Sequence, residues 1–122
     1  METIAQHQEL LQYSEAYISD MLMLKNIFLQ DQNDKIIDSN FGLPFFLAKK
    51  KNTTIAFASL TVNEKNEISF KIYHKKGASE TEMSSFYAQT LSYFKKNNAP
   101  NFRNPEQLKS SIKSMIYWLN FE

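Results

Sequence analysis

Residues 44–74 read PFFLAKKKNTTIAFASLTVNEKNEISFKIYH, and this stretch decides the fold. β-branched and aromatic residues fill three runs within it, and Asn, Lys and Glu fill the two gaps, where polar side chains suit a reversing backbone. The runs are Phe45–Lys50, Thr54–Val62 and Ile68–His74. Connections this short allow only antiparallel neighbours, because a parallel crossover needs about a dozen residues or more. The sequence therefore predicts an antiparallel meander of three strands.

The alternation of residues within the runs indicates which faces of the meander are buried. Ile68, Phe70 and Ile72 share one face of the last strand, and polar residues alternate with them. That pattern is typical of a strand buried on one side. The middle strand carries apolar residues on both faces, so we expect it to be central and covered on at least part of its second face.

Apolar residues at helical spacing predict three helices around the meander. The first is expected over residues 3 to about 24, where apolar side chains recur every three or four positions. The second is expected to begin after Ser79, which can form a capping box with Glu82. The third is expected to follow the cap Asn104, because Pro105 then takes the first helical position.

Residues 25–38 allow two interpretations. In the first, the N-terminal helix ends near Leu24, and Ile27–Leu29 forms a hairpin with Lys35–Ile37. In the second, the helix continues to Phe28, which lies on the same apolar stripe. We prefer the hairpin, because the intervening QDQND segment is typical of a turn.

The predicted fold class is α+β, as one domain over residues 1–122. It consists of an N-terminal helix, an antiparallel sheet of three to five strands and two C-terminal helices. The 43% hydrophobic and 14% aromatic content indicates a folded protein rather than a disordered one.

Composition also argues against several kinds of chemistry. The chain has no cysteine, and its two glycines, Gly42 and Gly77, are too far apart for a phosphate-binding loop. Its two histidines, His7 and His74, do not have the spacing of a zinc site. Residues 31–35 begin like a calcium loop but place lysine at the fifth position, so a turn is the better interpretation. We therefore expect no metal, no cofactor and no catalytic centre.

The same composition bears on partners and location. The net charge of +1 gives no indication of nucleic-acid binding. No apolar run approaches the roughly 20 residues of a membrane helix, and the first residues do not resemble a signal peptide. We expect a cytoplasmic protein without membrane contact.

Charge is distributed unevenly along the chain. Residues 1–48 hold seven acids and two bases, net −5, whereas residues 49–122 hold six acids and twelve bases, net +6. In an antiparallel meander the first turn lies at the same end as the finish of the third strand. We therefore expect one basic cluster, called here the lysine rim: Lys49, Lys50, Lys51, His74, Lys75 and Lys76. It is either a solvated sheet end that discourages edge-to-edge pairing or a docking site for an acidic partner or phosphate-bearing ligand.

Three aromatic residues of the last helix lie off its apolar stripe: Tyr117, Trp118 and Phe121. Large exposed aromatic patches usually mark an interface, and twofold pairing is the commonest way to cover one. We therefore predict an interface at these residues and a homodimer. The alternative is that they fold back over the second face of Leu60 and Val62 and complete a monomer's core.

Part of the chain resembles the GNAT-type acetyltransferases. The resemblance lies in the strands from Phe45 to Tyr73, the helix that follows them, and the segment Tyr117–Glu122. That family binds the coenzyme A pyrophosphate with a glycine-containing loop between its fourth strand and the next helix. The corresponding segment here, His74–Ser79, has one glycine and lacks that signature.

The segment Phe28–Asp31, with Lys35–Ile37 and Asn40, resembles the opening hairpin of PAS sensor domains. The chain is assigned to neither family. The function we expect is a non-catalytic protein-interaction module, such as a small chaperone, immunity-type or adaptor protein, bound to a protein partner or to itself. The alternative is a degenerate GNAT-like acyltransferase or a PAS-like small-molecule sensor.

Overall fold

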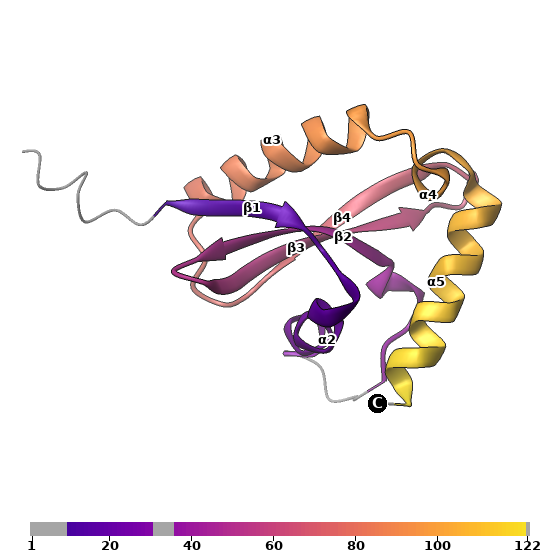
Figure 1. Ribbon diagram of the computed structural model, residues 1–122, viewed down its shortest axis with the longest axis horizontal. Helices are drawn as coiled ribbons and strands as arrows, with labels where there is room; N and C mark the ends of the chain where they lie inside the picture. Colours follow the sequence, from indigo (N-terminus) through magenta and orange to yellow (C-terminus); the bar gives the residue numbers. More distant parts are fainter. Residues whose placement is uncertain (1–9, 31–35, 122) are drawn as a thin grey trace, which may run out of the picture.

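One four-stranded antiparallel sheet organises the computed structural model, which describes residues 10–30 and 36–121 (Figure 1). Its strands follow the order β1-β2-β3-β4, and helices surround them, so the α+β class is confirmed. The elements in chain order are β1 (Leu11–Glu15), η1 (Ile18–Asp20), α2 (Met21–Leu29), η2 (Ser39–Phe41), β2 (Leu43–Lys50), β3 (Thr53–Val62), β4 (Ile68–His74), α3 (Glu80–Lys96), α4 (Pro100–Arg103) and α5 (Pro105–Asn120).

The predicted meander is present as β2, β3 and β4, with each strand boundary within two residues of the expected one. Lys51 and Asn52 both have positive φ, 52° and 64°, which is the backbone of a tight two-residue hairpin turn. The pairing of β2 with β3 shifts register twice, once at Phe45 and once at Ile55, and neither residue has a partner on the opposite strand. The first shift lets Phe45 and its neighbour Phe46 contact the same core cluster.

The predicted N-terminal helix is wrong over residues 11–15, which form the edge strand β1, and residues 1–9 lie outside the described part of the chain. β1 pairs antiparallel with β2, from Leu11 opposite Lys50 to Glu15 opposite Phe46. Half-buried Leu11 and Tyr13 alternate with exposed neighbours, a period of two that also satisfies a strand. Hydrogen bonding to the backbone of β2 therefore decides that this segment is a strand.

The preferred hairpin after Leu24 is also wrong, because α2 continues to Leu29. Leu24, Ile27 and Phe28 are all buried, and the spacing of three and four brings them onto one helix face. The second interpretation is right that a helix reaches Phe28, but this helix begins at Met21 and is not a continuation of the predicted N-terminal helix. Residues 31–35, which contain most of the expected turn, lie outside the described residues.

Two apolar layers cover the sheet, one on each face (Figure 1). On one face, Leu47 and Phe57 pack with residues of α2, η2 and the C-terminal half of α5. On the other, the alanines of β2 and β3 pack with Phe86 of α3 and with Leu108 at the start of α5. α5 thus belongs to both layers, and the central strand is covered on both sides as predicted.

The start of each long C-terminal helix is confirmed by its cap. Ser79 Oγ accepts a hydrogen bond from Glu82 N at 3.0 Å, and Glu82 Oε1 accepts one from Ser79 N at 3.1 Å. Asn104 Oδ1 accepts from Glu106 N and Gln107 N at 3.0 and 3.1 Å, ahead of α5. The short helix α4 between them was not predicted.

Candidate interaction surface and ligand cleft

The last turn of α5 presents the three aromatic residues that were predicted to form an interface. Tyr117 is 69% exposed, Trp118 37% and Phe121 74%. The rings of Tyr117 and Phe121 contact each other, with their centroids 4.8 Å apart. We call these three residues the aromatic end of α5. They do not fold back over Leu60, which is buried in the cluster that contains Phe86 of α3.

A groove of about 490 Å³ borders the aromatic end of α5. Ile18 of η1, Leu43 of β2, and Met115 and Trp118 of α5 supply its apolar lining. Serine, asparagine and glutamine supply the remainder, and none of the described residues that line it carries a charge. We call it the neutral groove. Ile18 is 64% exposed, so the apolar surface continues from α5 onto the segment that leads into α2.

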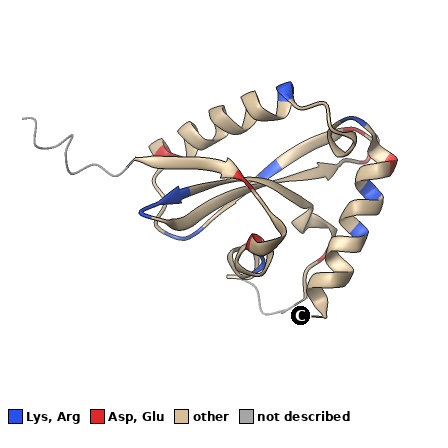
Figure 2. Cartoon of the chain, viewed as in Figure 1, with Lys and Arg blue, Asp and Glu red and all other residues tan. Residues whose placement is uncertain are grey.

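The lysine rim lies at one end of the sheet, as its topology predicted (Figure 2). Lys50 immediately precedes the tight turn into β3, and Lys75 N donates a hydrogen bond to Ile55 O at 2.8 Å, close to the same turn. Consecutive strand residues point to opposite faces, so Lys49 and Lys50 diverge. Lys50, Lys75 and Lys76 together line one depression beside α3, and Lys75 and Lys76 also border another beside α2. Three lysines of the rim are therefore neighbours, whereas Lys49, Lys51 and His74 are not among the described residues that line these two depressions.

The carboxylate of Glu82 already neutralises part of the rim. Lys50 Nζ lies 2.7 Å from Glu82 Oε2, in the first turn of α3. This contact, together with the hydrogen bond from the Ser79 backbone N–H, lowers the pKa of Glu82. A carboxylate thus stands where a bound anion would meet both the lysine and the helix N-terminus. His74 Nδ1 lies 2.9 Å from Lys75 O. Anion binding by the rim stays a prediction.

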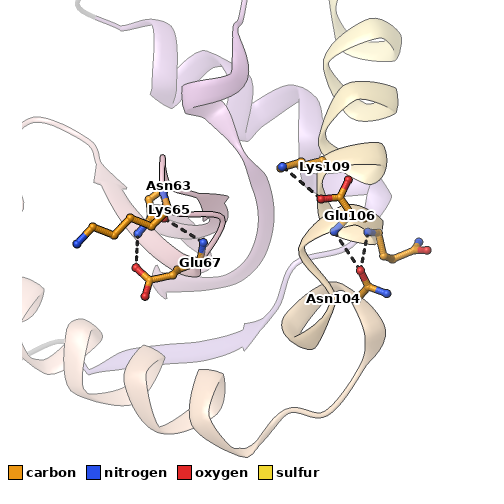
Figure 3. Close-up of polar contacts among 7 residues, drawn as sticks. Asn63, Lys65, Glu67, Asn104, Glu106 and Lys109 are labelled. Atoms are coloured by element: carbon orange, nitrogen blue, oxygen red, sulfur yellow. Dashed lines mark hydrogen bonds and ion pairs between the residues drawn. The ribbon is translucent and has the colours of Figure 1, made fainter.

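A larger cleft, of about 670 Å³, lies on the opposite side of α5 from the neutral groove. Its three walls are Ser39 and Asn40 of η2, the adjoining ends of β3 and β4 with the turn between them, and one face of α5. Figure 3 shows Lys109 extending from α5 on the side of the β3–β4 turn. Lys71 of β4 and Lys113 of α5 also line the cleft, and Glu64 is the one acid among its described lining residues.

Hydrogen bonds hold the β3–β4 turn, which forms one wall of the cleft (Figure 3). Asn63 Oδ1 accepts from Lys65 N at 2.9 Å and from Glu67 N at 3.0 Å, while Asn63 Nδ2 donates to Glu67 Oε1 at 3.0 Å. Asn66 takes a positive φ of 65° to close the turn. The wall is therefore built by its own sequence rather than by contact with α5.

The loop at η2 forms a second wall and is held on the sheet by Tyr73. The Tyr73 hydroxyl donates a hydrogen bond to Asn40 O, and Lys71 Nζ donates to Asn40 Oδ1 at 3.3 Å. Burial, and then the nearby charge of Asp38, raise the pKa of Tyr73, so its hydroxyl keeps its proton. Phe41 anchors the loop from below, with none of its side chain exposed.

Sequence reasoning missed this cleft, although part of the signal was present. Lys109 and Lys113 are four residues apart on α5 and alternate with Ile112 and Ile116. That spacing puts two cations beside two apolar side chains on one helix face. Nothing local indicated that Lys71 of β4 would face them.

The described part of the chain holds no group of three or more His, Cys, Asp or Glu residues arranged to bind a metal ion. Within that same part, none of the helices is both long enough and apolar enough to cross a membrane. Comparison with protein-family models, with curated proteins and with solved structures found no match for this chain.

Proposed function

We propose that the protein is a non-catalytic interaction module that forms a twofold homodimer through the aromatic end of α5 and the neutral groove. The observation that supports this best is the exposure of Tyr117, Trp118 and Phe121 beside a groove that has apolar residues and no charge among its described lining. Aromatic residues are enriched at interfaces, and charged residues are depleted at interface centres. The aromatic end of α5 and the neutral groove together are rich in aromatic side chains and have no charge among the described residues that line the groove.

A second copy of the chain is the partner that best fits this surface. A twofold interface uses the same patch on both subunits, so the patch has to complement itself. An uncharged groove satisfies this condition, because two copies that meet there bring no like charges together. The exposed Tyr117 and Phe121 rings contact each other and lie next to Trp118, which lines the groove, so they can supply the apolar side chains that would enter the groove of the partner.

The mass of the protein in solution tests the proposal. At micromolar concentration, sedimentation velocity should give the mass of two chains, and Trp118 should be shielded from a soluble quencher. The double variant Tyr117→Ser/Phe121→Ser should weaken dimerisation at least about tenfold, because central aromatic residues dominate interface energies. The dimer dissociation constant of each variant is the measured quantity.

Tyr87→Ser is the matched control. Tyr87 is 52% exposed on α3, so its loss removes an exposed aromatic side chain away from the proposed interface. It should leave the dissociation constant unchanged. A wild-type mass of one chain, or equal weakening by the control, would contradict the proposed dimer.

A further inference from the structure

We propose that the cleft between the β3–β4 end of the sheet and α5 binds a small organic anion, with one acidic head group and an apolar body. This site lies apart from the proposed dimer surface, since its α5 residues are not those of the neutral groove. The inference therefore does not depend on the proposed function. It rests on charge, lining and shape within the cleft.

The charges of the cleft favour an anion. Among its described lining residues, Lys71, Lys109 and Lys113 supply three ammonium groups and Glu64 supplies one carboxylate, a surplus of two positive charges. Lys113 forms no ion pair with any residue in the described ranges. Among the residues that the structure describes, Lys71 donates only to a neutral amide oxygen, that of Asn40. Lys109 lies 3.4 Å from Glu106, in an exposed pair that contributes little to stability and exchanges readily with a ligand.

The remaining lining favours a ligand that also carries an apolar group. Val62 of β3 with Ile112 and Ile116 of α5 form the apolar part of the cleft. On β3 and β4, Thr61 Oγ1 and Ser69 Oγ lie 3.3 Å apart and offer hydroxyl groups to a head group. Small-molecule sites typically combine such an apolar lining with a few polar groups in a cavity of about 300–1,000 Å³. The volume of about 670 Å³ falls within this range.

The cleft is also preformed. The side chain of Asn63 holds the β3–β4 turn, Tyr73 holds the η2 loop, and α5 is packed through its buried residues. A site whose walls are fixed before binding loses less entropy when the ligand enters. Neither the lysine rim nor the neutral groove combines these properties of charge, lining and preformed walls. In the rim, Glu82 already pairs with Lys50, and the described lining of the neutral groove carries no charge.

Calorimetric titration of the full chain with matched probes tests the proposal. Octanoate and phenyl phosphate each join an anionic head to an apolar body, and octanol, phenol and inorganic phosphate each lack one of the two parts. At least one of the two amphiphilic anions should bind saturably and at least about tenfold more tightly than its counterparts that lack one part. Octyl phosphate has nearly the same apolar body as octanoate, so comparing these two affinities identifies the preferred head group as carboxylate or phosphate. The affinity of the anion that binds should fall as salt is raised.

The double variant Lys71→Gln/Lys113→Gln should weaken binding of that probe by at least about tenfold, because it removes two of the three cations. Lys95→Gln/Lys96→Gln is the matched control, since it removes the same charge from exposed positions in the last turn of α3. Circular dichroism confirms that both variants are folded.

Three results would overturn the proposal. The first is no saturable binding of either amphiphilic anion. The second is binding that the cleft variant and the control weaken equally. The third is binding that survives loss of Lys71 and Lys113 but disappears in Tyr117→Ser/Phe121→Ser, which would place the probe at the aromatic end of α5.

Discussion

Gly42 leaves no room for a side chain. It precedes β2 with φ of 69°, and a Cβ atom at this position would lie 2.4 Å from Leu60 O and 3.0 Å from Ser59 Cβ. We expect Gly42→Ala to lower the free energy of unfolding by about 3 kcal/mol or more, because it adds backbone strain and forces the loop off β3. Chemical denaturation measures this loss.

Gly77→Ala separates the two causes of the expected loss. Gly77 also has a positive φ, 91°, but no atom lies within 4 Å of the position of its added Cβ. This substitution should therefore lower the free energy of unfolding only by the backbone strain, about 1 kcal/mol. Equal losses in the two variants would show that the close approach of Gly42 to β3 is unimportant.

Glu82 makes a pH-dependent contribution to stability. Its pKa in the folded protein is lower than the ordinary value of 4.5, because of Lys50 and the Ser79 N–H. The charged carboxylate therefore stabilises the fold above that ordinary value, and the stabilisation is lost as the pH falls through the folded-state pKa. Glu82→Gln, which keeps the capping hydrogen bond, should be less stable than the wild type at about pH 7, and this difference should be smaller at about pH 3.

Urea denaturation of both proteins at the two pH values measures the difference. The other carboxyl groups are common to both proteins, so their titration cancels. A difference in stability that does not change with pH would contradict the role of the charge.

At the scale of elements, the C-terminal end of α5 is fastened to the chain segment before η2. Asn120 Oδ1 accepts from Ile37 N at 2.9 Å, and Asn120 Nδ2 donates to Ile37 O at 3.1 Å, as a neighbouring strand would. Lys25 Nζ of α2 donates to Leu119 O at 2.6 Å, where a cation also suits the helix dipole. These contacts join three segments that are distant in sequence.

Asn120→Ala should lower the free energy of unfolding by about 2 kcal/mol, because it leaves both backbone groups of Ile37 without their partner beside a side chain that is 2% exposed. Asn120→Asp keeps the acceptor for Ile37 N but sets a carboxylate oxygen against Ile37 O, at the negative end of the helix dipole, so its loss at about pH 7 should be no smaller. Thermal or urea denaturation compares both variants with the wild type. Unchanged stability in both would mean that the Asn120 side chain does not fasten α5 to this segment.

At the scale of the whole molecule, α5 serves two surfaces at once. One side of the helix lines the cleft with Lys109, Ile112 and Lys113, while another lines the neutral groove with Met115 and Trp118. The buried stripe between them packs on both layers of the core. Because the two surfaces share a helix but not these residues, we expect substitutions to affect the proposed dimerisation and the proposed anion binding separately.

Local signals in the sequence were enough to predict much of this architecture. Strand alternation located β2, β3 and β4, and the caps Ser79 and Asn104 located α3 and α5. The exposure of the aromatic end of α5 followed from its position off the apolar stripe. Each of these features depends on residues within a few positions of one another, where steric and hydrogen-bonding preferences act directly.

Tertiary structure alone decided the rest. Leu11 and Tyr13 are compatible with a helix or a strand, and the pairing edge of β2, more than 30 residues away, selects the strand. α2 extends past Leu24 because a core layer is present to bury Ile27 and Phe28. The cleft joins η2, β4 and α5, so its cations become neighbours only when the chain has folded. The sequence by itself determined which segments could be strands or helices, and burial against distant partners determined which conformation each ambiguous segment took and which lysines came together.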